Sequence, residues 1–96
     1  MSQPVSVVCR GTREGFACNV RVGTDRDATR HNVLVSHDDL ASLAPGHYDP
    51  HELVAASFVF LLEREPRESI LRQFDLPVIE RYFPGYEAQI RRQMAR

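Results

Sequence analysis

Four histidines and their neighbouring carboxylates are the side chains of this chain best suited to hold a metal ion. His47 and His51 are four residues apart with Asp49 between them, and His37 lies upstream. Imidazole nitrogens and carboxylate oxygens are common ligands of zinc and related ions. The sequence predicts, however, that His47 precedes a helix and that His51 lies in its first turn, so the two do not share a helix face as in H-E-x-x-H sites. We therefore expect no metal and no cofactor, and leave open whether the three histidines approach one another.

Cys9 and Cys18 could in principle form a redox pair. They do not make a C-x-x-C motif, and no lysine or predicted helix N-terminus lies nearby to stabilise a thiolate. Both fall on the apolar face of predicted strands, where an unpaired cysteine is commonly buried. We expect two free thiols in a reducing compartment, packed as small apolar side chains.

The serines and carboxylates of the chain lack the neighbours that catalysis requires. Ser57 and Ser69 have no Gly-x-Ser-x-Gly context and no adjacent base. Glu63 and Glu65 flank Arg64, an arrangement typical of ion pairs at a solvated helix end. The glycines form no phosphate-binding pattern. We therefore expect no catalytic residue and no enzymatic activity.

Residues 53–62, LVAASFVFLL, are apolar on nearly every side when they are projected as a helix. A surface helix needs an apolar stripe on one face only. Two explanations remain open: the sheet and the later helices cover this segment completely, or part of it stays open to a second copy or another protein. The second explanation rests on the rarity of large exposed apolar patches in monomers.

Aromatic and aliphatic residues are also dense between residues 74 and 86. Their helical spacing is typical of a core, but tyrosines beside arginines are also common anchors of protein interfaces. The candidate interface residues are Phe58, Leu62, Arg81, Tyr82 and Tyr86. We expect a non-catalytic protein-protein interaction or adaptor module that binds a protein partner or forms a homodimer.

A nucleic-acid-binding accessory protein is the alternative hypothesis. All twelve basic residues are arginines, and four of them in the last part of the chain could form a basic strip: Arg81, Arg91, Arg92 and Arg96. Acidic residues are interspersed, however, and the formal net charge is -1. A dedicated nucleic-acid binder normally carries a clear basic excess. The charge balance therefore makes this alternative the weaker one.

The elements that must position these side chains can be predicted from periodicity. Alternating apolar residues predict two strands joined by a turn around Arg13 and Glu14, and a third strand follows. One register satisfies the hairpin, with these pairs opposite each other: Cys9 and Cys18, Val7 and Val20, Val5 and Val22. We therefore predict a three-stranded antiparallel meander.

After residue 35 the apolar period changes to that of helices. Ser36 and Asp39 predict a capping box, and Asp49 is the predicted N-cap of a helix that reaches Arg64. Further helices are predicted over 66–74, over 76–83 with Asp75 as its N-cap, and over 86–94.

The composition agrees with one small domain. The chain has 96 residues, of which 43% are apolar and 26% charged. Strands followed by helices predict an α+β fold over residues 1–96, with three to five helices packed on one face of the meander. No apolar run is long enough for a membrane span, and residues 1–10 do not resemble a secretion signal, so we expect a cytoplasmic protein without membrane contact.

Residues 60–87, FLLEREPRESILRQFDLPVIERYFPGYE, resemble the C-terminal part of a family of small bacterial proteins to which no activity is assigned. With LVAASF just upstream, the resemblance covers about the last half of the chain. It implies a bacterial protein of unknown function and supplies no catalytic or ligand-binding residue.

Overall fold

The alternating first third of the chain forms three antiparallel strands. The computed structural model describes residues 3–95 and contains β1 (Val5–Gly11), β2 (Gly15–Val22) and β3 (Thr29–Ser36). Cys9 pairs with Cys18, Val7 with Val20 and Val5 with Val22, so the predicted register is confirmed. This register puts the apolar side chains of all three strands on one face, because side chains alternate along a strand.

A fourth strand, β4 (Gln73–Asp75), pairs in parallel with β3 and gives the sheet order β1-β2-β3-β4. The prediction of a helix over 66–74 is wrong at this point. Only a single 3-10 turn, η1 (Arg67–Ser69), forms before the chain becomes extended. The segment pairs with the main chain of Asn32 and Leu34 on β3, and this pairing outweighs the local preference for a helix.

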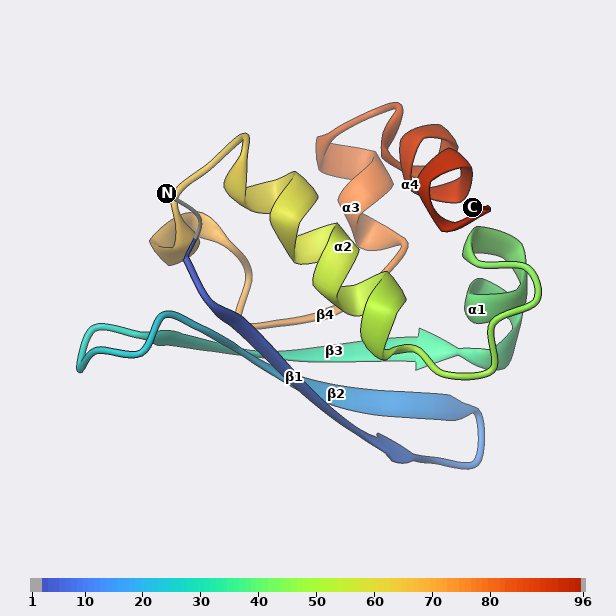
Figure 1. Cartoon of the computed structure of the whole chain (residues 1–96), viewed down its shortest axis with the longest axis horizontal. Helices are drawn as coiled ribbons and strands as arrows, with labels where there is room; N and C mark the ends of the chain where they lie inside the picture. The colour runs from blue at the N-terminus through green and yellow to red at the C-terminus, as the bar shows by residue number, and fades with distance from the viewer. Residues whose placement is uncertain (1–2, 96) are drawn as a thin grey trace.

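The four α-helices are α1 (His37–Leu43), α2 (His51–Leu62), α3 (Val78–Tyr82) and α4 (Tyr86–Met94). All of them lie on one side of the sheet, and no element within residues 3–95 covers the opposite side (Figure 1). The α+β class is therefore confirmed, with a four-stranded sheet in place of the predicted three-stranded one. Within the described part of the chain, each helix is too short or too polar to cross a bilayer.

The helix starts agree with the sequence at α1 but not at α2 or α3. At α1 the Ser36 hydroxyl accepts from the Asp39 N–H at 3.0 Å, and the Ser36 N–H donates to the Asp39 carboxylate at 3.3 Å. At α2 the N-cap position is Pro50, although Asp49 still accepts from the His51 N–H at 2.8 Å. Proline takes the N-cap position of α3 as well, in place of Asp75. Its fixed φ already suits a helix start.

Helix α2 crosses the inner face of the sheet and forms the centre of the core (Figure 1). Half of its residues are buried: Leu53, Val54, Ser57, Phe58, Phe60 and Leu61. The sheet covers one side of α2, and α3 and α4 cover much of the other. Its apolar circumference is therefore mostly internal, which is the first of the two explanations given by the sequence.

Cys9 and Cys18 are joined by a disulfide, which corrects the expectation of free thiols. The physical reason is the register itself, because the hairpin brings the two cysteines directly opposite each other on the same face. The same bond links β1 and β2 covalently beside the start of α2.

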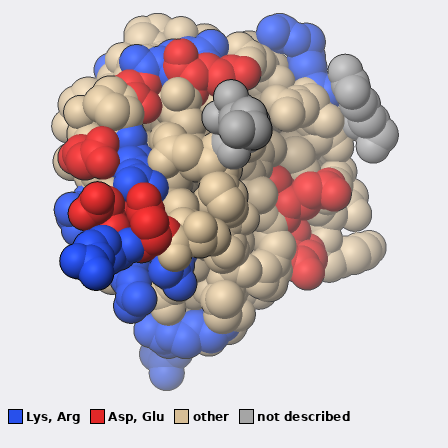
Figure 2. Space-filling model, turned by 60° about the vertical axis from the view of Figure 1, so that its left-hand side comes forward, with Lys and Arg blue, Asp and Glu red and all other residues tan. Residues whose placement is uncertain are grey.

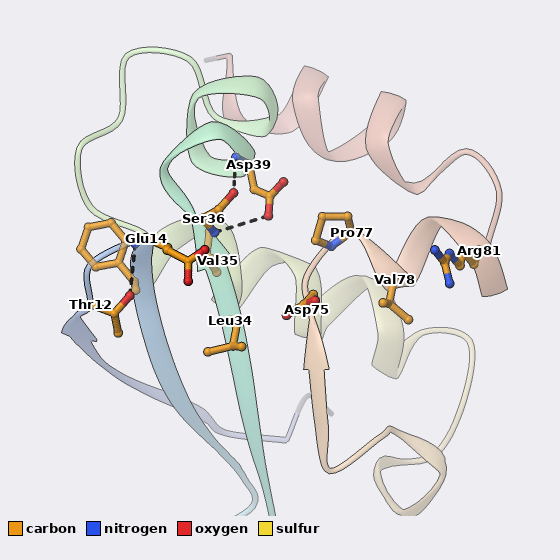
Figure 3. A pocket seen from close by; sticks show the side chains of 12 residues that line it. Thr12, Glu14, Leu34, Val35, Ser36, Asp39, Asp75, Pro77, Val78 and Arg81 are labelled. Carbon is orange, nitrogen blue, oxygen red and sulfur yellow. Dashed lines mark hydrogen bonds between the residues drawn. The ribbon is translucent and has the colours of Figure 1, made fainter.

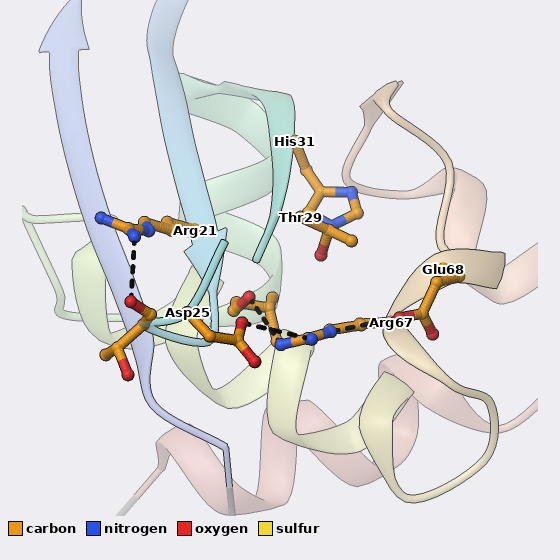
Figure 4. Close-up of polar contacts among 8 residues, drawn as sticks. Arg21, Asp25, Thr29, His31, Arg67 and Glu68 are labelled. Atoms are coloured by element: carbon orange, nitrogen blue, oxygen red, sulfur yellow. Dashed lines mark hydrogen bonds and ion pairs between the residues drawn. The ribbon is translucent and has the colours of Figure 1, made fainter. Parts of the chain in front are cut away.

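Arg67 ties η1 to the turn between β2 and β3 (Figure 4). Its guanidinium donates to the Val22 carbonyl at 3.3 Å and pairs with Asp25 at 3.4 Å and Glu68 at 3.2 Å. Its side chain is only 14% exposed. This mostly buried arginine anchors the segment that leads into β4.

Candidate functional site

Helix α3 separates two hollows on the surface of the molecule. The smaller hollow has a volume of about 130 Å³ and lies between α3, the end of α2 and β4. Its lining is almost entirely apolar and includes Leu61, Ile70, Leu71, Phe74, Val78 and Tyr82. A concave apolar surface of this kind is a typical seat for a side chain of a binding partner.

Two large side chains at this hollow are exposed to solvent. Tyr82 is 65% exposed and Leu71 is 46% exposed. Helical spacing from Ile79 predicts an inward Tyr82, but α3 ends at this residue and Phe83 turns inward instead. The Phe83 ring then packs edge-on against Phe60, with 6.2 Å between the ring centroids. The early end of α3 is thus what leaves Tyr82 outside the core.

Glu65 is the only carboxylate that lines the smaller hollow. Partial burial raises its pKa above the usual range. Among residues 3–95, the Glu65 carboxylate has neither a hydrogen bond nor an ion pair. We refer to Glu65, Leu71, Val78, Tyr82 and Phe83 as the Tyr82 surface. It combines an apolar hollow with one carboxylate that a partner cation would stabilise.

The larger hollow, of about 630 Å³, lies on the other side of α3 where β3 and β4 end (Figure 3). Val78 lines both hollows. Glu14, Asp39 and Asp75 contribute carboxylates to the larger one, and Arg81 contributes a guanidinium. These groups are solvated or, in the case of Asp39, already used in the capping box. The larger hollow is therefore a polar cleft with charges of both signs.

The predicted interface residues separate into buried and exposed groups. Phe58 and Tyr86 are fully buried, which corrects their assignment to an interface. Each is held by aromatic packing inside the core, Phe58 against His31 and Tyr86 against Phe60, both with 5.2 Å between ring centroids. Leu62 is half-buried, and only Arg81 and Tyr82 of the five are freely exposed.

Tyr86 has an internal partner for its polar tip. Its hydroxyl lies 2.6 Å from the Ser57 hydroxyl, which in turn donates to the Leu53 carbonyl at 2.8 Å. Burial raises the pKa of Tyr86 far above its usual value, so the phenol stays protonated. Both hydroxyls are thus satisfied inside the core, and Ser57 has no base that would make it a nucleophile.

Three of the four arginines of the predicted strip lie in the described residues, and they have different surroundings. Arg91 donates to the Ser42 carbonyl at 2.9 Å and lies 3.9 Å from Glu87, whereas Arg81 is on α3 and Arg92 is exposed on α4. Arg96 lies outside the described residues. Figure 2 shows basic and acidic side chains interspersed on one face of the molecule.

The three histidines of the metal hypothesis have separate partners. His47 contacts the Met94 carbonyl at 3.0 Å, His51 contacts Asp49, and His37 packs edge-on against Phe16. No group of three metal-ligating side chains comes together anywhere in residues 3–95. The histidines do not form a shared site there.

Sequence reasoning missed the part of the site that lies on either side of η1. Leu71, Glu65 and the edge strand β4 all adjoin Tyr82, yet none was a candidate. A period-two signal was present, because Phe74 and Leu76 are buried and alternate with exposed Gln73 and Asp75. This alternating segment was too short to favour a strand over the helix predicted for residues 66–74.

Comparisons of this chain with known proteins found no relative. No protein-family model matches the chain, and no curated protein or solved structure matches it. The resemblance of residues 60–87 to a bacterial family therefore stays a prediction.

Proposed function

We propose that this chain is a non-catalytic protein-binding module and that the Tyr82 surface is its binding site. The observation that carries the proposal is the apolar hollow of about 130 Å³ with Tyr82 and Leu71 exposed beside it. Tyrosine at the edge of an apolar pocket is a common interface anchor, since its ring is buried while its hydroxyl finds a polar partner. No catalytic group is needed for this role.

Self-association through α2 is the less favoured form of this proposal, because half of the residues of that helix are buried in the core. We therefore favour another polypeptide as the partner. A second copy of the chain is the competing occupant, and it would contact the same Tyr82 surface.

A matched pair of variants tests the proposal. Tyr82→Ser removes the anchor, whereas Tyr48→Ser changes another tyrosine that is 92% exposed and remote from the hollow. Proteins captured from the native cell by each variant are compared quantitatively with those captured by the unmodified chain. We expect a partner that Tyr82→Ser loses and Tyr48→Ser keeps.

Sedimentation of the purified chain at several concentrations decides between the two occupants. A mass that rises with concentration, and that Tyr82→Ser returns to one chain, indicates a homodimer. Capture that is identical for both tyrosine variants, together with a single-chain mass, contradicts the proposal.

Nucleic-acid binding is a second candidate, supported by the uncovered sheet face rather than by the predicted strip. Arg21 and Arg30 lie directly opposite each other there, and like charges in this position destabilise a sheet unless an anion lies between them. Affinity for single-stranded DNA or RNA that falls steeply with salt, and that Arg21→Gln weakens, would favour this candidate.

A cytoplasmic location remains part of the proposal, and the disulfide makes it testable. Reducing compartments keep most cysteine pairs open, whereas oxidising compartments keep them closed. Alkylation of Cys9 and Cys18 in intact cells before lysis reports their state. Free thiols support the cytoplasm, and a closed bond contradicts it.

A further inference from the structure

The free edge of β4 lies beside the Tyr82 surface. Parallel pairing engages every second residue of a strand. Asn32 donates to the Arg72 carbonyl at 2.7 Å and Leu76 donates to the Leu34 carbonyl at 3.0 Å, which fixes Phe74 as the residue whose main chain bonds to β3. The main-chain groups of Gln73 and Asp75 therefore point away from β3.

The opposite edge of the sheet is protected at its centre. There the Cys9 N–H, which also points away from its neighbour strand, donates to His51 Nε2 at 3.3 Å. No comparable contact reaches the N–H groups of Gln73 and Asp75 within the described residues. An edge strand with unpaired main-chain groups readily accepts a further strand.

The geometry of strand addition connects this edge to the hollow. Phe74 faces the core and lines the hollow, whereas its neighbours Gln73 and Asp75 are exposed. Side chains of adjacent strands lie next to each other on the same face of a sheet. A strand added beside β4 would thus direct its core-facing side chain into the space between Phe74 and Tyr82.

The charge of the hollow indicates which side chain the partner carries next to its buried apolar residue. Glu65 supplies the only formal charge in an otherwise apolar lining, and its carboxylate has no cation within residues 3–95. A lysine or arginine near the buried apolar residue would pair with the Glu65 carboxylate.

We propose that β4 binds an extended segment of a protein partner as a fifth strand, with an apolar side chain in the hollow and a basic side chain beside Glu65. This inference rests on the proposed function and specifies how the partner is held. Main-chain hydrogen bonds supply the affinity, and the hollow and the carboxylate supply the sequence preference.

Peptides selected from a random phage-displayed library against the intact chain provide the probe. We expect enriched peptides to share an apolar residue with a lysine or arginine close by. Binding of one such fluorescent peptide is then measured by anisotropy. Tyr82→Ser should weaken peptide binding about tenfold, and Tyr48→Ser should leave it unchanged. Glu65→Gln should weaken the binding of peptides that carry the basic residue and should not affect peptides that lack it.

The fifth strand itself is tested without changing the protein. N-methylation of the peptide's main-chain amides removes their donors and should weaken binding at least tenfold at alternate positions only. Hydrogen exchange at the amides of Gln73 and Asp75 should slow when the unmethylated peptide is bound. Gln73→Pro, which removes one outward donor, should reproduce the loss if the variant folds.

The outcomes separate the two proposals. Binding that depends on Tyr82 but not on the peptide amides, with unchanged exchange at Gln73 and Asp75, overturns the fifth strand and leaves the protein-binding function intact. Peptides that bind irrespective of Tyr82, or no enriched peptide together with identical capture by the tyrosine variants, overturn both.

Discussion

Protonation of His31 should destabilise the fold, because the charged ring would be buried in the core. His31 lies on β3 close to Thr29 (Figure 4) and is 1% exposed. Its ring packs against Phe58, with 5.2 Å between the ring centroids. Its Nδ1 donates to the Leu71 carbonyl at 2.8 Å, and Nε2 lies 2.9 Å from the Thr29 hydroxyl. These contacts suit a neutral ring in which Nδ1 carries the proton and Nε2 accepts from Thr29.

The sign of the effect follows from the pKa of His31, which lies below 6.5 in the fold. Burial is the main cause of this lowering and the positive charge of Arg72 adds to it, while the hydrogen bond to Leu71 acts in the opposite direction. Between pH 6.5 and the folded pKa, the unfolded chain binds a proton that the folded chain does not. The contribution of neutral His31 to the free energy of unfolding is therefore fully present above pH 6.5 and is lost as the pH falls. The loss is at most about 1.4 kcal/mol per pH unit for one group.

The assay is urea unfolding of the chain at several pH values between about 5 and 7, a window set by the ordinary titration of histidine. His31→Gln removes the titration and should flatten the pH dependence, even though it lowers stability at neutral pH. His37→Gln changes an exposed histidine and serves as the control. An unchanged pH slope in His31→Gln would refute the reasoning, since another group would then carry the effect.

Three further changes test the core and the hairpin. Tyr86→Phe should lower the free energy of unfolding by about 1 kcal/mol, because the 2.6 Å hydrogen bond to Ser57 is lost while Ser57 still donates to the Leu53 carbonyl. A double-mutant cycle of Tyr86→Phe with Ser57→Ala should show strong coupling. The double change of Cys9 and Cys18 to alanine should cost about 2–3 kcal/mol from the closed loop alone, and dithiothreitol should then no longer lower the unfolding midpoint. Gly15→Ala should lower the melting temperature, since its Cβ would lie 2.2 Å from the Val35 carbonyl oxygen; Gly11→Ala, with no atom within 4 Å, is the control, and equal melting temperatures would contradict the packing.

The hairpin and its register could be predicted because their determinants are local. Val5, Val7 and Cys9 alternate along one strand, and a two-residue turn fixes which residues they oppose. The capping box of α1 could be predicted for the same reason, since Ser36 and Asp39 are three residues apart. The candidate site was predicted only in part, at Tyr82, since Arg81 lines the larger hollow on the other side of α3.

The remainder of the site depends on contacts between distant segments. Whether Tyr82 or Phe83 turns into the core depends on where α3 ends against Phe60, which helical spacing does not encode. The same holds for Phe58 and Tyr86, whose aromatic rings fit an interface as well as a core until the sheet and helices close around them.

The sequence by itself determined an α+β chain with a three-stranded meander, because period-two and period-3.6 patterns are properties of neighbouring residues. Only the tertiary structure decided that Gln73–Asp75 joins β3 as an edge strand and that α2 is internal. Each of these depends on which surfaces meet once the chain has folded, and burial and strand pairing between distant residues set that outcome.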